Sequence, residues 1–96
     1  MAAYVIFQAD ITDEERYERY RAATPPTIAA AGGRFIARGG AVTVLEGDAP
    51  AGRTVIVEFP DRQAALDWYN GDEYTAARAL REKAATGRMY IVDGVD

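Results

Sequence analysis

A chain of 96 residues with a formal net charge of −4 and 49% hydrophobic residues is sized for one folded domain over residues 1–96. The acidic balance and the lack of a basic block argue against a nucleic-acid partner. Cysteine and histidine are absent, which excludes disulfides, thiolate chemistry and the commonest metal ligands, so we expect neither a metal nor a cofactor.

Two further features predict where the protein is found in the cell. No apolar run approaches the roughly 20 residues of a membrane span, and no secretory signal is visible. We therefore expect a cytoplasmic protein that does not bind membranes. Among the basic residues only Lys83 is lysine, so an arginine at any one position is weak evidence for a site.

The first predicted elements are a strand over residues 3–9 and a helix that follows it. Thr12 with Glu15 three positions later forms a capping box, which predicts the start of the helix. We expect a kink or break near Thr24, because two prolines follow it, and an end at the glycines at 32 and 33. One stripe of this helix holds Tyr17, Tyr20, Thr24, Ile28 and Ala31.

A second strand is predicted to begin at Arg34 and to resume over residues 41–46 after the glycines at 39 and 40. Alternation would place Arg34 and Arg38 on the same face as Ile36. The glycine pair predicts a bulge or bend that aims Arg38. A loop over 47–52 and a third strand over 53–59 follow.

The remaining elements are a helix in two parts and a last strand. Asp61 is the expected cap, Trp68 and Tyr69 point to the core, and Asp72 caps a continuation that Gly87 ends. The last strand is predicted over 88–93. The order of elements predicts an α+β, ferredoxin-like βαββαβ sandwich.

The sheet face away from the helices is predicted to be apolar. An exposed apolar face indicates association, so we expect a homodimer that closes two sheets face to face as a dimeric alpha-beta barrel. The alternating set assigned to this face is Ile6, Ile36, Val55, Val57, Tyr90 and Val92.

Three runs of the sequence resemble a known family, the domain-of-unknown-function 1330 family. They are "GGRFIARGGAVTVLEG", "VIVEFPDRQAALDWYNGDEYTAARALR" and "GRMYIVDGV", and the resemblance extends from Tyr4 to Val95. It implies dimeric alpha-beta barrels of ferredoxin-like topology. That superfamily includes cofactor-independent monooxygenases, lactone isomerases and haem-handling enzymes, and the resemblance implies no catalytic residue.

Arg38 is the first candidate ligand-binding residue, because a guanidinium binds carboxylate or phosphate at two points. The alternative, which we weight slightly higher, is an ion pair with Glu46, Glu58 or a partner chain.

Aromatic residues supply the other ligand-binding candidates. Tyr74 and Arg78, four apart on a helix, form one spot with Trp68 nearby, which would suit an organic acid. Tyr17 faces the sheet from the first helix. Packing in the core is the alternative, and it is favoured for Trp68.

Two carboxylates are weak catalytic candidates. Asp10 is the most plausible proton acceptor and Glu58 the second, and either would need burial to raise its pKa. For Asp10, a role in a turn or cap is the favoured alternative.

Three functions remain open on the sequence. The first is a homodimer that binds a small organic molecule between sheet and helices, and the arginines would suit an acidic one. The second is a cofactor-independent enzyme of the monooxygenase or isomerase kind. The third is a non-catalytic dimerisation module. A cavity of about 300 Å³ lined by the candidate residues would favour the first two.

Overall fold

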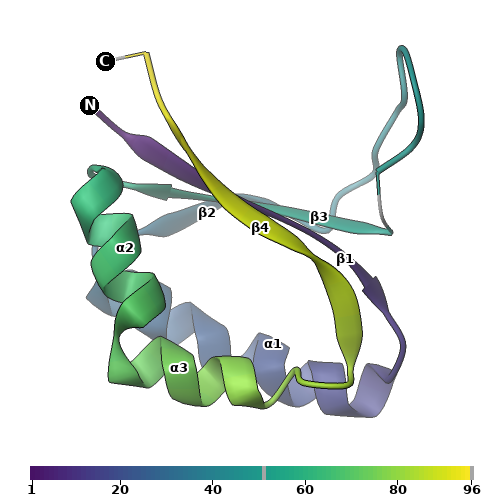
Figure 1. Cartoon of the computed structure of the whole chain (residues 1–96), viewed down its shortest axis with the longest axis horizontal. Coiled ribbons are helices and arrows are strands. Elements are labelled where there is room, and N and C mark those ends of the chain that lie inside the picture. Colours follow the sequence, from purple (N-terminus) through teal and green to yellow (C-terminus); the bar gives the residue numbers. More distant parts are fainter. Residues whose placement is uncertain (51, 96) are drawn as a thin grey trace.

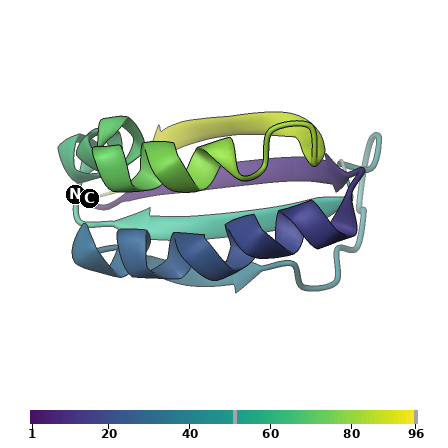
Figure 2. The ribbon, with the colours of Figure 1, turned by 90° about the horizontal axis from the view of Figure 1, so that it is seen from below.

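The computed structural model describes residues 1–50 and 52–95, and it shows a four-stranded antiparallel sheet covered on one face by three helices (Figures 1 and 2). The strand order β2-β3-β1-β4 is that of a ferredoxin-like fold, which confirms the predicted class. No helix in the described residues is long and apolar enough to cross a membrane. The elements are β1 (Ala3–Ile11), α1 (Glu14–Ala30), β2 (Arg34–Arg38), β3 (Arg53–Phe59), α2 (Arg62–Asn70), α3 (Asp72–Ala79) and β4 (Ala85–Asp93).

The core lies between the sheet and the helices. Alternate residues of β1 and β3 are buried on the helix side, and Val5 is opposite Val57 in the register. The rings of Phe59 and Trp68 meet at 5.2 Å between centroids, so α2 is fixed on the sheet by aromatic packing. The buried apolar residues of this cluster are Val5, Phe7, Ala9, Tyr17, Tyr20, Ile28, Val55, Val57, Phe59, Ala65, Trp68, Tyr74, Ala77 and Ala84.

Helix α1 differs from its prediction at both its start and its middle. The N-cap is Asp13, whose side chain accepts from the Arg16 N–H, so the cap lies one residue after Thr12. The helix continues through the two prolines without a break. Pro25 has no N–H, which leaves the carbonyl of Arg21 without its helical partner, and Arg38 donates to that carbonyl instead.

Strand β2 corrects the predicted placement of its arginines. A bulge lies between Phe35 and Ala37, before the glycine pair that was expected to form it. The extra residue reverses the alternation, so Arg34 is opposite Glu58 on the outer face whereas Arg38 is opposite Val55 on the helix side. Arg34 and Arg38 therefore lie on opposite faces of the sheet.

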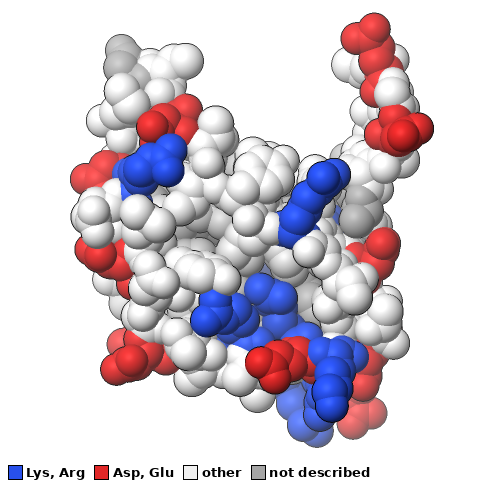
Figure 3. All heavy atoms as spheres, in the orientation of Figure 1, with Lys and Arg blue, Asp and Glu red and all other residues white. Residues whose placement is uncertain are grey.

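The segment after β2 is not the resumed strand that was predicted. Residues 41–46 have no strand structure and are exposed, and the segment rises from the sheet on the side away from the helices (Figure 1). Figure 3 shows acidic side chains at its tip, where Glu46 and Asp48 occur in the sequence. The apolar side chains of Val42, Val44 and Leu45 are exposed along it.

The C-terminal third corrects two predicted boundaries. Helix α3 ends at Ala79, where a turn follows, rather than near Gly87, and its N-cap is Gly71 rather than Asp72. Gly87 lies within β4 opposite Ala9, and a Cβ there would collide with the Gln8 carbonyl oxygen. This glycine therefore allows close strand approach and does not end a helix.

The outer face of the sheet is apolar, as predicted, but its membership changes. Val55 and Val57 face the helices, and Ile56 takes their place because it is opposite Ile6. The prediction chose the more apolar parity of β3 for the outer face, because Thr54 and Glu58, which alternate with Ile56, are polar. The apolar residues of the outer face are Ile6, Ile36, Ile56, Tyr90 and Val92.

Candidate functional site

A cavity lies between the sheet and the helices. Its volume is about 30 Å³, the room of about one water molecule, and far below the 300 Å³ that the sequence criterion required. Its walls come from β1, α1, β2, β3, α2 and β4. The lining residues are Val5, Phe7, Tyr17, Tyr20, Arg21, Thr24, Ile28, Phe35, Arg38, Arg53, Val55, Val57, Trp68 and Met89.

Three arginines from three different elements belong to this lining. Arg21 of α1 forms an ion pair with Glu18 at 3.2 Å. The Arg38 guanidinium lies 4.5 Å from the centre of the Phe35 ring and donates to the Arg21 carbonyl at 3.3 Å. The Arg53 Nε is buried and has no hydrogen-bond partner in the described part of the chain. The apolar cavity thus has a cationic side.

Two tyrosines of α1, Tyr17 and Tyr20, also belong to the polar part of the lining. The hydroxyls of Tyr20 and Tyr74 are 2.7 Å apart and share a buried hydrogen bond. Burial raises the pKa of Tyr20 well above its ordinary value, and the neighbouring Tyr74 adds to the rise. Burial likewise raises the pKa of Tyr17, although Arg53 opposes the rise. The hydroxyls of Tyr17 and Tyr20 therefore stay protonated at neutral pH.

The aromatic candidates of α2 and α3 occupy different places. Trp68 lines the cavity, its ring lies 4.0 Å from that of Tyr74, and its Nε1 donates to the Thr27 hydroxyl at 3.0 Å. Tyr74 is fully buried behind it. Arg78 lies over the Tyr69 ring at 4.4 Å, outside the cavity. The structure thus brings Arg38, Tyr17 and Trp68 together at the cavity, but not Arg78.

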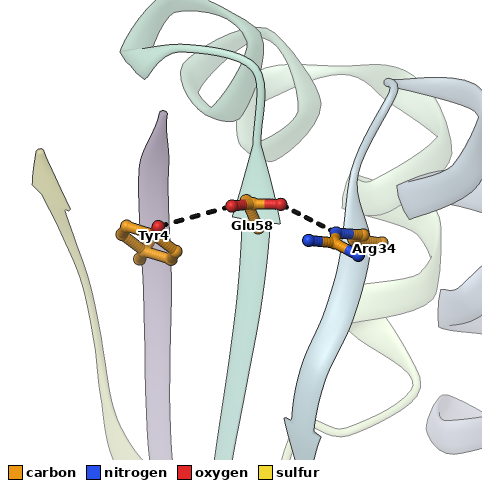
Figure 4. A network of polar contacts seen from close by, with 3 residues as sticks. All are labelled: Tyr4, Arg34 and Glu58. Carbon is orange, nitrogen blue, oxygen red and sulfur yellow. Dashed lines mark hydrogen bonds and ion pairs between the residues drawn. The ribbon is translucent and has the colours of Figure 1, made fainter. Parts of the chain in front are cut away.

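The two catalytic candidates lie outside the cavity. Asp10 is exposed, and its carboxylate accepts from the Gly52 N–H at 2.9 Å. Glu58 lies on the outer face of β3, the strand between β2 and β1. Its carboxylate accepts from the Tyr4 hydroxyl at 3.3 Å and from the Arg34 Nε at 2.7 Å (Figure 4). The Arg34 hydrogen bond lowers the pKa of Glu58, which is opposite to what a general base at neutral pH needs.

The sequence interpretation missed Arg53. The signal was present in "RTVIVEF", where Arg53 alternates with two buried valines and Phe59 on one parity. Assigning the valines to the outer face hid this arginine. It also hid the role of Gly39, which has a φ of 73° and where an added Cβ would collide with the Arg53 guanidinium.

A wider hollow of about 360 Å³ opens on the surface between α2 and β4. It shares Val5, Trp68 and Met89 with the enclosed cavity, so these side chains border both spaces. Met89 is the most adaptable of the three, because its unbranched chain has three rotatable bonds. Within residues 1–50 and 52–95, no group of acidic side chains is placed to hold a metal ion.

The comparisons with known proteins identify the family. The model of the domain of unknown function DUF1330 matches residues 2–95, and the chain therefore belongs to this family, as its sequence motifs predicted. No protein with a curated description matches the sequence significantly.

Solved structures resemble the chain in fold. A protein of unknown function from Rhodopseudomonas palustris has a TM-score of 0.77 at 17% identity, covering 99% of this chain and 83% of its own. SnoaB, a cofactor-independent oxygenase from Streptomyces nogalater, has a TM-score of 0.65 at 11% identity over 99% and 94%. A dimeric protein of ferredoxin-like fold and unknown function from Bacteroides fragilis has a TM-score of 0.54 at 12% identity over 97% and 95%.

Proposed function

We propose that this chain is a homodimer that binds a small organic molecule between its sheet and its helices. The observation that carries the proposal is the cavity, in which an apolar and aromatic wall from six elements meets a few polar groups. This combination is typical of small-molecule sites. The enclosed volume holds no such molecule by itself, so binding requires side chains at the mouth to move.

The residues at the mouth can make that movement. Arg21 and Arg38 are exposed, and Arg38 is held by one long hydrogen bond and by stacking on Phe35. On the other side, rotation of Met89 would join the cavity to the hollow beside α2. A bound molecule would therefore occupy space that these three side chains leave.

Dimerisation through the outer face is the second part of the proposal. Ile36, Tyr90 and Val92 are 45–47% exposed there, and a cluster of this kind is typical of an interface. The dimeric relative in fold from Bacteroides fragilis supports this assembly.

Native mass spectrometry of the purified protein tests both parts. A mass of twice the chain plus a constant increment supports a dimer with bound ligand, and the increment identifies the ligand. A bare dimer that also fails to bind a panel of small organic molecules would favour a dimerisation module without a ligand. A monomer at micromolar concentration would contradict the proposed assembly.

A cofactor-independent enzyme is the second candidate, favoured by the fold shared with SnoaB. The cavity presents the hydroxyls of Tyr17, Tyr20 and Thr24, and its described lining contains no carboxylate, which limits proton abstraction within it. Tyr20 and Thr24 bond Tyr74 and the Tyr20 carbonyl, so Tyr17 is the hydroxyl to test. Dioxygen uptake by the protein with its identified ligand tests this candidate. Uptake that falls at least tenfold in Tyr17→Phe supports it, and uptake no faster than without protein rejects it.

A further inference from the structure

Building on the proposed function, we propose that the molecule bound in the cavity is an organic acid with a flat apolar body, and that Arg53 and Arg38 bind its carboxylate. The assignment depends on the charges around the cavity, on the way Arg53 is held, and on the shape of the apolar wall.

The charges around the cavity are unbalanced in favour of cations. The chain has 15 acidic and 11 basic residues, so acids are in excess overall. Among the described residues, however, neither Arg38 nor Arg53 has an acid within ion-pair distance. Asp10, on the strand next to Arg53, is engaged by the Gly52 N–H. A carboxylate from outside would supply the missing partner.

Arg53 is held by its surroundings in a way that a surface arginine is not. Its Nε is buried without a partner, an arrangement that is unfavourable unless something else accepts from it. Its guanidinium passes against Gly39, which has no Cβ to obstruct it. The Tyr17 ring centre is 6.0 Å away, and the pKa of Tyr17 responds to the charge of Arg53. Arg53 thus lines the cavity beside Tyr17, and its Nε has no hydrogen-bond partner among the described residues.

The rest of the lining suits a flat apolar body. Phe7, Phe35 and Trp68 line the space. Besides Arg38 and Arg53, the charged residue in the described lining is Arg21, which pairs with Glu18. The Arg81 guanidinium lies over the Phe7 and Tyr20 rings but is not part of the lining. Arg38 already stacks on the Phe35 ring, so a planar acid could slide between this ring and the guanidinium. An aromatic carboxylate meets both requirements, since one end pairs with the arginines and the ring lies on apolar side chains.

Benzoate and its neutral isostere benzamide form the first test, by isothermal titration of the full chain. Because only benzoate offers an anion, we expect it to bind at least tenfold more tightly than benzamide. The variants Arg53→Met and Arg38→Met should each lose this preference. Arg88→Met is the control, because Arg88 bonds Gln8 on the outer face, and it should bind as the natural chain does.

Two glycine variants form the second test and separate the position of Arg53 from its charge. Gly39→Ala places a Cβ into the Arg53 guanidinium, whereas Gly47→Ala meets nothing within 4 Å. The backbone strain is matched, since φ is 73° at Gly39 and 79° at Gly47. We expect benzoate affinity to fall at least fivefold in Gly39→Ala only, with circular dichroism confirming that both variants fold.

The outcomes distinguish this inference from the function on which it rests. Equal affinity for benzoate and benzamide, or unchanged benzoate affinity in Arg53→Met, overturns the carboxylate assignment and leaves small-molecule binding in place. A neutral ligand found by native mass spectrometry does the same. If neither probe binds and the purified protein carries no ligand, the binding function itself is contradicted.

Discussion

At the residue scale, the hydroxyl pair of Tyr20 and Tyr74 joins α1 to α3 in the core. Tyr74→Phe would remove one hydroxyl and with it the hydrogen bond that the buried Tyr20 hydroxyl shares, so we expect the free energy of unfolding to fall by about 1–3 kcal/mol. Urea denaturation measures this change. Tyr69→Phe is the control, since no hydrogen bond joins the Tyr69 hydroxyl to another described residue, and its effect should be under about 0.5 kcal/mol. Equal effects in both variants would contradict the role of the pair.

A second residue-scale prediction concerns Glu58 and the acid side of stability. The hydrogen bond from Arg34 lowers the pKa of Glu58, so the folded state binds its proton less readily than the unfolded state. The stabilisation is therefore complete above the ordinary glutamate pKa of 4.5 and is lost as pH falls through the lowered value. Glu58→Gln should therefore lose less stability than the natural chain between pH 5 and pH 3, because the contribution of this carboxylate is missing. Thermal melts over this pH range measure the difference.

The control for this prediction is Glu82→Gln. Glu82 forms no ion pair with any other described residue. Its variant should keep the pH profile of the natural chain. A profile unchanged by Glu58→Gln would show that the exposed Arg34 pair contributes nothing measurable, as many surface pairs do.

At the scale of elements, strand order and periodicity were predictable from the sequence, and the local irregularities were not. Ile6 of β1 was correctly assigned to the outer face, and the cap at Asp61 was found directly. The bulge in β2 was placed at the glycine pair, because glycine is the usual signal, yet it lies between Phe35 and Ala37. One extra residue reverses which face the following side chains occupy. Because the bulge lies before Arg38, this residue is on the helix side and lines the cavity, whereas the prediction placed it on the outer face.

The site was less predictable than the fold for the same reason. Arg38, Tyr17 and Trp68 were chosen from local patterns, and all three line the cavity. Arg53 could be found only by knowing which parity of β3 faces the helices. The strand has one apolar parity, Val55, Val57 and Phe59, whereas Thr54 and Glu58 make the other parity polar, and these two polar residues were the deciding signal.

The proline pair of α1 supports a prediction at the same scale. Pro25→Ala would restore the N–H that donates to the Arg21 carbonyl and should raise the free energy of unfolding by about 1–2 kcal/mol. This net gain already includes an opposing contribution of about 0.4–1 kcal/mol, because alanine gives the unfolded chain more conformational entropy than proline does. Urea denaturation measures the change. Pro50→Ala, outside the helices, is the control and should lower stability slightly. A loss of stability in Pro25→Ala would show that the ring packs better than the restored bond.

At the scale of the whole molecule, the two faces of the sheet carry different groups. The helix side holds the cavity and its arginines, and the outer side carries apolar residues with the Tyr4–Glu58–Arg34 network along one part of it (Figure 4). The segment after β2 rises on this outer side with Leu45 90% exposed (Figure 1). A second copy set against the outer face would cover these apolar groups, which water solvates poorly.

The last prediction tests that arrangement with a substitution that leaves the core intact. Ile36 is 47% exposed on the outer face, so Ile36→Lys removes no core packing but places a charge in the proposed interface. We expect the dimer dissociation constant, from sedimentation velocity over a dilution series, to rise at least tenfold, because a buried unpaired lysine is strongly unfavourable. Leu80→Lys is the control: Leu80 is 38% exposed at the end of α3, on the helix side, so its dissociation constant should not change. Equal weakening by both variants, or by neither, would place the dimer contact elsewhere on the molecule.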